Sequence, residues 1–346
     1  MMDKWSLALT GLLAVGLAAE AQAQELQVSP AELATMKAEY KRPAPRLTEN
    51  KALVDLGRLL FWDPRASASG KTACASCHFP DLGWGVLDPK SRNDSGKLTS
   101  RKSQPLIGIG YMQAPVGWDG RSASLEAQAK SSIATGSMSM RETEAPVKVE
   151  VIEGRFRAIS EYVAMFNAAL PGKAINIDSM VKAIAAFERT MEPGIAPFDR
   201  WIEGNESAIS ESAKRGFVLF NRGANCFACH SGWRFTDDKF HDIGVSKSDR
   251  GRGTALKNDE AAQYAFKTPT LRSVALRPPY MHDGSLATLA DVIEHYEKEP
   301  VDRPSRSPLF VPVELTEQER GDLIAFMQSL TGAPEGEPAP QLPVGR

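Results

Sequence analysis

The hydrophobic and polar positions of this chain follow the period of an α-helix over several separate stretches. In Glu49 to Phe61 (ENKALVDLGRLLF), apolar side chains recur at the three- and four-residue intervals that place them on one helical face. Runs of alternating valine and isoleucine, which would indicate half-buried strands, are almost absent. The pattern therefore predicts a mainly α-helical fold with long irregular loops. The other segments with this period are Ile177 to Met191, Ser210 to Phe220, Leu289 to Tyr296 and Thr316 to Leu330.

The N-terminus has the three parts of a secretory signal peptide. Lys4 supplies a positive start, Trp5 to Ala19 is a short apolar run, and Ala21 to Ala23 (AQA) has the form of a cleavage site. The run is shorter than the ~18 apolar residues that would indicate a membrane span, so cleavage is favoured over an uncleaved anchor. We expect a mature protein that starts near Gln24, is exported to the periplasm and is not inserted in the membrane.

Composition and charge change this picture little. The 346 residues suffice for two modest domains, and a hydrophobic content of 42% is ordinary for a protein that buries a core. A formal net charge of −2 gives no reason to expect nucleic acid or an anionic membrane as a partner. Arg42 to Arg46 (RPAPR) is expected to be an irregular lead-in. From Gly332 onward the chain is rich in proline and glycine, which predicts a flexible tail.

The cysteines carry the strongest chemical signal. The chain has only four, and they form two copies of one motif, Cys74 to His78 (CASCH) and Cys226 to His230 (CFACH). C-x-x-C-H is the attachment motif of c-type haem. The two thiols reach the two vinyl groups of one porphyrin, and the histidine that follows presents its imidazole to the iron. The motifs therefore predict two covalently bound c-type haems, held by Cys74, Cys77, Cys226 and Cys229, with His78 and His230 as proximal iron ligands.

Three other interpretations of the cysteines explain less. A thioredoxin-like dithiol would not need a following histidine twice, and a zinc site usually draws its thiolates from two nearby pairs. Disulfides suit an exported protein, but the haem motifs already account for all four cysteines. One motif in each half predicts one haem per domain, with a signal peptide over 1–23, an N-terminal haem domain over 24–173, a C-terminal haem domain over 174–331 and a tail over 332–346.

Further motifs, in this order along the chain, resemble those of the bacterial di-haem cytochrome c peroxidase superfamily. The resemblance covers nearly all of the mature chain and is specific in combination, whereas each motif alone would be weak. It implies two cytochrome c-like helical domains and closest similarity in ligand pattern to the MauG/MbnH-like branch. The motifs are Phe61 to Arg65 (FWDPR), Trp118 to Arg121 (WDGR), Phe187 to Thr190 (FERT), Lys267 to Arg272 (KTPTLR) and Pro279 to Gly284 (PYMHDG).

The histidines indicate that the N-terminal haem has an open coordination position. The chain has five histidines, and none lies between His78 and His230. In the scavenging peroxidases of the family, a loop histidine before the Trp-Asp-Gly-Arg segment caps this haem at rest. The corresponding loop, Gly83 to Gln104, contains no histidine. The resemblance therefore implies an iron that reacts with peroxide without prior reduction, as in MauG-like members.

The C-terminal haem is expected to have a tyrosine ligand. The scavenging peroxidases place a methionine fourteen residues after the histidine of the Tyr-x-His-Asp-Gly segment, and here that position is Tyr296. Leu289 and Tyr296 share one helical face, whereas His295 falls on the polar side. An ordinary buried tyrosine is the alternative, and it would leave the iron to Met281, to His282 or without a sixth ligand. A phenolate-like oxygen favours Fe(III) and higher states, whereas a thioether favours ferrous iron.

Two residues are assigned to catalysis by the resemblance. Trp118 matches the tryptophan that lies between the haems, where an indole can relay an electron hole, although it could equally be a large aromatic of the inter-domain core. Gln128 matches a distal-pocket glutamine, with a solvated helix residue as the alternative. The distal proline of the branch falls on Ser132 and the family's acidic residue on Met138. Glu142 and Glu144 are close enough in sequence to supply the general acid/base that peroxide chemistry needs.

The inter-domain calcium site of the family fits poorly. Its asparagine position is Lys102, and its threonine carbonyl position is Arg277, just before Pro278. A lysine ammonium could occupy the space of a cation, so the sequence argues against bound calcium without excluding it.

Three functions compete. The first is a periplasmic di-haem enzyme that uses hydrogen peroxide, through a bis-Fe(IV)-type state, to oxidise tryptophan or tyrosine side chains of a partner protein. The second is a cytochrome c peroxidase that reduces peroxide to water with electrons from a small redox protein. The third is a non-catalytic di-haem electron carrier, which would need both irons to be six-coordinate. The missing loop histidine and Tyr296 favour the first. Ser132 and Met138 argue against assuming methylamine dehydrogenase as the substrate.

Overall fold

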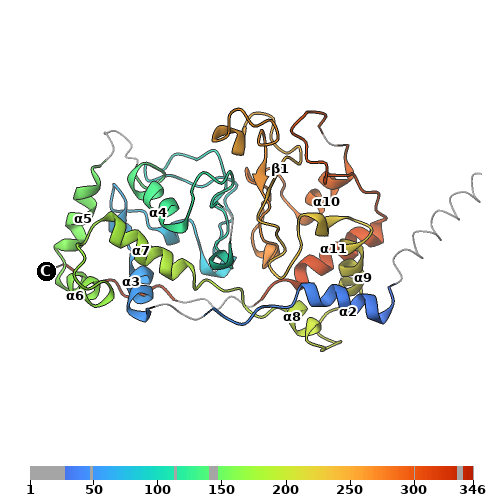
Figure 1. Cartoon of the computed structure of the whole chain (residues 1–346), viewed down its shortest axis with the longest axis horizontal. Helices are drawn as coiled ribbons and strands as arrows, with labels where there is room; N and C mark the ends of the chain where they lie inside the picture. Colours follow the sequence, from blue (N-terminus) through green and yellow to red (C-terminus); the bar gives the residue numbers. More distant parts are fainter. Residues whose placement is uncertain are drawn as a thin grey trace, which may run out of the picture.

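The structure is a computed structural model that describes residues 28–46, 50–112, 115–139, 147–299, 301–332 and 338–345. It consists of two helical halves side by side, with long loops facing one another between them (Figure 1). This confirms the predicted mainly α-helical fold. The expected signal peptide over 1–23 lies outside the described residues. Within the described ranges, no helix is long and apolar enough to cross a membrane.

The N-terminal half is built around the helix that leads into the first C-x-x-C-H motif. Its helix α3 packs along α7 and is also contacted by α6, while α4 lies against α7. Gly57 makes the first of these crossings possible, because a Cβ there would lie 1.9 Å from the carbonyl oxygen of Ala183 in α7. The helices of this half are α3 (Lys51–Trp62), α4 (Leu125–Ala134), α5 (Val149–Arg157), α6 (Ser160–Ala169) and α7 (Ile177–Glu188).

The C-terminal half repeats this arrangement. Helix α9 leads into the second motif and packs along α11, and Gly216 of α9 lies against the backbone of Asp322, where a Cβ would come within 2.0 Å of its carbonyl oxygen. The same close glycine crossing before each haem motif supports two related modules. The helices are α2 (Pro30–Glu39), α8 (Pro197–Ile202), α9 (Glu211–Asn221), α10 (Leu289–Glu297) and α11 (Glu317–Ser329).

The remaining regular structure is short. Among the described residues the only sheet pairs β1 (Phe240–His241) with β2 (Phe266–Lys267) in antiparallel register, Phe240 opposite Lys267 and His241 opposite Phe266. Single turns of 3-10 helix occur in the loops, and two of them carry the cysteine motifs. They are η1 (Pro64–Ala66), η2 (Cys74–Ser76), η3 (Pro80–Leu82), η4 (Ile109–Tyr111), η5 (Cys226–Ala228), η6 (Arg252–Thr254) and η7 (Val274–Leu276).

The two hydrophobic cores divide between Met191 and Ala196, and the domain boundary at 173/174 stays a prediction. The first core continues through α7 to Met191, because the apolar face of α7 packs on α3. The second core begins at Ala196 and includes Tyr40, which follows α2 and stacks on Phe235 with ring centroids 4.8 Å apart. Within residues 28–46, α2 and Tyr40 therefore belong to the C-terminal half, whereas Arg46 donates to the carbonyl oxygen of Gly110 in the N-terminal half.

Residues 338–345, which belong to the segment expected to be a flexible tail, contact the N-terminal half. This segment lies on the N-terminal half (Figure 1), where its backbone carbonyls accept hydrogen bonds from two arginines. Arg58 donates to the oxygen of Pro338 at 2.6 Å, and Arg65 donates to that of Pro343 at 2.8 Å. Pro343 is buried. The proline and glycine content correctly indicated that residues 338–345 form no helix or strand. It did not indicate that they contact the N-terminal half.

Candidate haem centres and the junction between them

Both haem motifs hold their histidine in the orientation that an iron ligand needs. The Nδ1 atom of His78 lies 3.1 Å from the carbonyl oxygen of Trp84, and that of His230 lies 2.8 Å from the carbonyl oxygen of Phe235. A carbonyl can only accept, so Nδ1 carries the proton and Nε2 is left with its lone pair. Such a backbone partner is typical of metal-bound histidines. All four cysteines are free thiols rather than disulfides, and the residues of both motifs fit a covalent haem.

A large cavity opens beside the second motif. Its empty space is about 1690 Å³, a figure that includes the part open to solvent. Cys226, Cys229 and His230 line it together with apolar side chains of α9, α10 and α11. The cavity therefore suits a flat, mostly apolar macrocycle attached at its wall.

Helix α10 directs Tyr296 into this cavity. The helix starts with a capping box between Thr288 and Asp291, and Leu289 and Ile293 bury its inner face in the second core. The same face carries Tyr296 to the lining of the cavity. Burial raises the pKa of its phenol well above the ordinary value, and no hydrogen bond from its hydroxyl is found among the described residues. A phenol placed in this way is available to an iron held by His230.

The other ligand candidates differ in position. The Nε2 atom of His295 lies 2.9 Å from the carbonyl oxygen of Ile243 and its ring stacks on Phe310, so this side chain belongs to a loop contact outside the cavity lining. His282 lines the cavity, but its ring is stacked on Phe266 with centroids 3.6 Å apart. Met281 also lines the cavity and remains the structural alternative to Tyr296.

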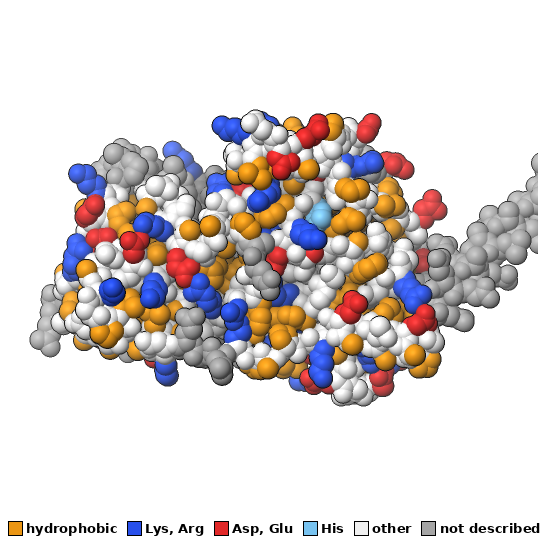
Figure 2. Space-filling model, in the orientation of Figure 1, with side chains coloured by type: hydrophobic (Ala, Val, Ile, Leu, Met, Phe, Trp, Pro, Cys, Tyr) orange, Lys and Arg blue, Asp and Glu red, His pale blue; other side chains and the backbone are white. Residues whose placement is uncertain are grey.

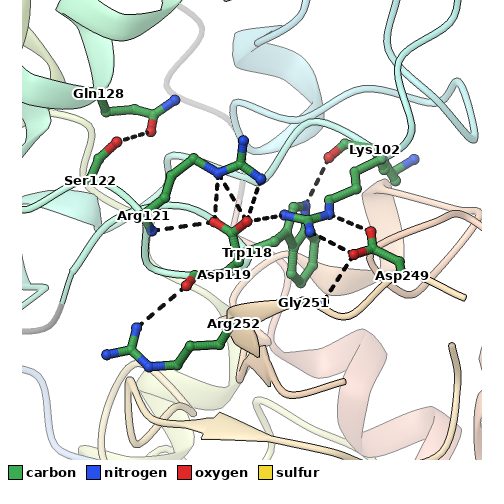
Figure 3. A network of polar contacts seen from close by, with 10 residues as sticks. Lys102, Trp118, Asp119, Arg121, Ser122, Gln128, Asp249, Gly251 and Arg252 are labelled. Carbon is green, nitrogen blue, oxygen red and sulfur yellow. Dashed lines mark hydrogen bonds and ion pairs between the residues drawn. The ribbon is translucent and has the colours of Figure 1, made fainter. Parts of the chain in front are cut away.

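Gln128, which the resemblance assigns to the pocket of the first haem, has a defined orientation. The hydroxyl of Ser122 donates to its Oε1 at 2.7 Å (Figure 3). Its Nε2 lies 3.4 Å from the hydroxyl oxygen of Ser132. Gln128 is half-buried on α4, which begins with Ser124 as N-cap. Ser132 stands at the position of the branch's distal proline. Its hydroxyl makes a polar contact with Gln128, which a proline ring could not make.

The acid/base position of the family is apolar here. Met138 is 5% exposed and belongs to the first core, and its thioether has no proton to give or take. Glu142 and Glu144 lie outside the described residues. The described part of this half contains another buried carboxyl, Glu188 at the end of α7, whose pKa is raised by burial to about 8 and which lies near Cys74.

Trp118 lies at the junction of the two halves. Its indole N–H donates to the carbonyl oxygen of Lys102 at 2.8 Å (Figure 3). Its own carbonyl accepts from the backbone N–H of Lys267 in the C-terminal half at 2.8 Å. Its ring contacts that of His282 edge to face, with centroids 6.5 Å apart, and it lines the cavity of the second motif. The structure thus places this tryptophan between the halves, in contact with the second haem cavity.

An ion-pair network next to Trp118 joins the halves. Arg101 donates at 2.7 Å to both Asp119 of its own half and Asp249 of the other, and Arg121 also pairs with Asp119 (Figure 3). The hydrogen bond from Arg101 lowers the pKa of Asp249 to about 2. Asp119 is 2% exposed, and its two arginine partners hold its pKa below the ordinary value although burial alone would raise it.

The Arg101–Asp249 pair leads to a prediction about stability and pH. Asp249→Asn should lower the free energy of unfolding at pH 7 by about 1 kcal/mol, since the pair is partly exposed. A carboxyl whose folded pKa is depressed stabilises above its unfolded pKa of ~3.9 and loses this effect as the pH falls toward the folded value of about 2. Urea unfolding should therefore show a difference from wild type that is constant above about pH 5 and shrinks below pH 4.

The control for this prediction is Asp55→Asn, which removes an exposed pair with Lys51 within α3. It should change the free energy of unfolding by less than about 0.5 kcal/mol at every pH. A difference for Asp249→Asn that grows as the pH falls would contradict the assignment.

The residues around Lys102 do not fit a calcium site. Its Nζ atom lies 3.2 Å from the carbonyl oxygen of Asp88 and 3.3 Å from that of Pro278, so the ammonium already occupies the oxygens that a cation would take. Arg277 adds a second buried cation, with its pKa lowered by burial to about 10. Calcium needs six to eight oxygen ligands, and two adjacent cationic side chains disfavour it.

Sequence reasoning missed Phe266 and the role of the Arg277 side chain at the junction. Phe266 stacks on His282, and Arg277 packs against Gly85 with an Nη1 atom that has no partner among the described residues. Such a buried donor beside the second cavity suits an anionic group, and haem propionates are of this kind. In the sequence these residues are only arginines and aromatics in predicted loops. Nothing in that pattern shows which of them contact each other.

Comparisons with known proteins agree with this geometry. Residues 51–207 match the family model described as di-haem cytochrome c peroxidase, and residues 213–331 match that of cytochrome c. The methylamine utilization protein MauG of Methylorubrum extorquens is 41% identical over 98% of this chain and 97% of its own length. Cytochrome c551 peroxidase of Nitrosomonas europaea is 31% identical over 85% and 84%.

Among solved structures, a MauG-like protein associated with microbial copper homeostasis superposes with a TM-score of 0.75 at 28% identity, covering 85% of this chain and 94% of that chain. The shared fold, the two C-x-x-C-H motifs and the near full-length similarity agree with one another. This chain belongs to the di-haem cytochrome c peroxidase/MauG family and is a peroxidase-type oxidoreductase with two c-type haems.

Proposed function

We propose that this protein uses hydrogen peroxide to oxidise tryptophan or tyrosine side chains of a partner protein. The observation that carries the proposal is the position of Tyr296, whose phenol enters the cavity of His230 without a hydrogen-bond partner among the described residues. A phenolate oxygen on haem iron stabilises the oxidised forms and lowers the reduction potential. Such a haem is poorly suited to accept electrons from an ordinary cytochrome and better suited to hold an oxidising equivalent.

The haems, once attached, supply the site where peroxide is reduced and where its two oxidising equivalents are held. Gln128, oriented by Ser122, is placed to donate a hydrogen bond from its amide in the first pocket. Trp118 offers an indole between the halves through which an electron can pass. A partner protein is too large to enter either pocket, so its side chains would be oxidised from the surface by electron transfer.

A scavenging cytochrome c peroxidase is the second candidate. Met281 lines the same cavity as Tyr296, and several relatives are named as cytochrome-c peroxidases. This function requires Met281 to displace Tyr296 as the ligand. A non-catalytic electron carrier would need two six-coordinate irons, and the described residues between the motifs hold no histidine that could cap the first one.

We place this function in the periplasm. The proposal rests on the signal-like residues before Gln24 and on the haem motifs, whose thioether attachment suits an exported protein. On the face shown in Figure 2, acidic and basic side chains are interspersed, which is consistent with a protein partner rather than a nucleic acid.

The test is the response of the as-isolated ferric protein to peroxide. Low-temperature EPR should show one high-spin and one low-spin ferric haem, and one equivalent of hydrogen peroxide should abolish both signals within the mixing time without any reductant. The change should last for seconds or longer and should decay faster when a tyrosine-containing protein is added. If the protein reacts with peroxide only after one-electron reduction, it is a scavenging peroxidase instead.

A further inference from the structure

Lys102 makes four hydrogen bonds at the junction, and they reach three segments of the chain, at Asp88, at Trp118 and at 278–282. Its backbone N–H donates to the carbonyl oxygen of His282 at 2.8 Å, and its carbonyl accepts the indole N–H of Trp118 at 2.8 Å. Its ammonium donates to the carbonyl oxygens of Asp88 and Pro278 at 3.2 and 3.3 Å. Asp88 belongs to the N-terminal half and Pro278 to the C-terminal half, so one side chain ties the two halves together.

The ammonium is an integral part of the packed interior rather than a surface charge. Lys102 is 7% exposed, and its charge faces carbonyl oxygens instead of a carboxylate hydrogen-bond partner. Burial and the neighbouring Arg277 lower the pKa of Lys102 to about 8, while Asp88 acts in the opposite direction. The group is therefore still an ammonium at neutral pH, and leaving its carbonyl partners unsatisfied would be costly.

Arg277 supports the same part of the junction from the C-terminal half. Its side chain packs against Gly83 and Gly85, where a Cβ on Gly85 would come within 2.8 Å of its Cδ. Between these glycines lies Trp84, whose carbonyl oxygen accepts the Nδ1 proton of His78. Two buried cations thus hold the loops that orient Trp118 on one side and the first proximal histidine on the other.

We propose that the Lys102 ammonium is a built-in cation that joins the two haem domains and positions Trp118, in place of a divalent metal ion. An ammonium offers three donors to oxygen atoms, which suits two carbonyls, whereas calcium would require several more oxygens. The protein would then keep its junction without any dissociable ion. This inference concerns the construction of the junction and does not depend on which substrate the enzyme oxidises.

The first test uses the wild-type holoprotein and measures metal. Elemental analysis of purified protein should find iron at two atoms per chain and calcium far below one. Treatment with excess EDTA, or addition of calcium chloride, should leave the ferric EPR spectrum and the thermal midpoint unchanged. One tightly bound calcium per chain, or a change in spectrum on chelation that calcium reverses, would overturn the proposal.

The second test compares variants by calorimetry of the holoprotein. Lys102→Met removes the charge at similar length and should lower the thermal midpoint by about 5 °C, with the single transition separating into two because the halves no longer unfold together. Lys102→Arg should restore most of the midpoint and the single transition. The matched control is Lys90→Met in the same loop, where the lysine is exposed, and it should behave as wild type.

Spectroscopy distinguishes a role of Lys102 in positioning Trp118 from a purely structural role. After one equivalent of peroxide, Lys102→Met should transfer oxidising equivalents between the haems about tenfold more slowly than Lys90→Met. The reason is that the ammonium no longer fixes the backbone segment whose carbonyl accepts the indole N–H of Trp118. Identical transfer rates and identical melting in Lys102→Met and Lys90→Met would show that the ammonium neither joins the halves nor positions Trp118.

Discussion

Tyr296→Phe should convert the low-spin ferric haem of the C-terminal domain to a high-spin form and raise its reduction potential by on the order of 100 mV. The phenol faces the cavity of His230, and the variant removes only its oxygen, so the packing of α10 on the second core through Leu289 and Ile293 is preserved. An iron that loses an anionic oxygen ligand stabilises its ferric state less. Low-temperature EPR and a spectroelectrochemical titration of the purified variant measure both effects.

Two controls separate ligation from a general disturbance of the cavity. Tyr280 lines the same cavity, and burial raises the pKa of its phenol too. Tyr280→Phe therefore removes a comparable oxygen at a position that does not match the family's ligand position fourteen residues after His282. It should leave the low-spin signal in place. Met281→Leu should do so as well. A signal that survives Tyr296→Phe and disappears in Met281→Leu would instead identify a thioether-ligated, scavenging peroxidase.

Helix periodicity correctly predicted the helices that line the cavity of the second haem motif. The expected segments at Leu289 and Thr316 correspond to α10 (Leu289–Glu297) and α11 (Glu317–Ser329), each within two residues at either end. The assignment of His295 to the polar side also agrees with its contact to a loop carbonyl. These features depend on side chains a few residues apart in one helix, and a sequence pattern reports such local geometry directly.

The junction could not be predicted in the same way, because its contacts join loops far apart in the chain. The carbonyl oxygens that bind the ammonium of Lys102 are backbone atoms of Asp88 and Pro278. Every residue type has such an oxygen, so the sequence cannot indicate which ones bind. The docking of residues 338–345 through backbone carbonyls was missed for the same reason. The packing of α7 on α3 is likewise a contact between segments far apart in the chain, which periodicity within α7 does not reveal.

Trp118→Phe should slow oxidation of a protein substrate by about 100-fold, equivalent to ~2.7 kcal/mol of barrier, while the first reaction with peroxide keeps its rate. Phenylalanine retains the apolar ring against His282 but has no N–H for the carbonyl oxygen of Lys102 and is much harder to oxidise than indole. Stopped-flow spectroscopy measures the peroxide step, and mass spectrometry of the substrate protein measures its modification.

The matched control for Trp118→Phe is Trp201→Phe. Trp201 is a fully buried tryptophan of the second core whose indole N–H is also hydrogen-bonded, to Glu206 at 2.8 Å, but it lies on α8, away from the contact between the halves. Its replacement should lower stability without slowing substrate oxidation. If both variants oxidise the substrate at the wild-type rate, electrons do not pass through the indole at the junction, and Trp118 serves there as a packing residue held by Lys102.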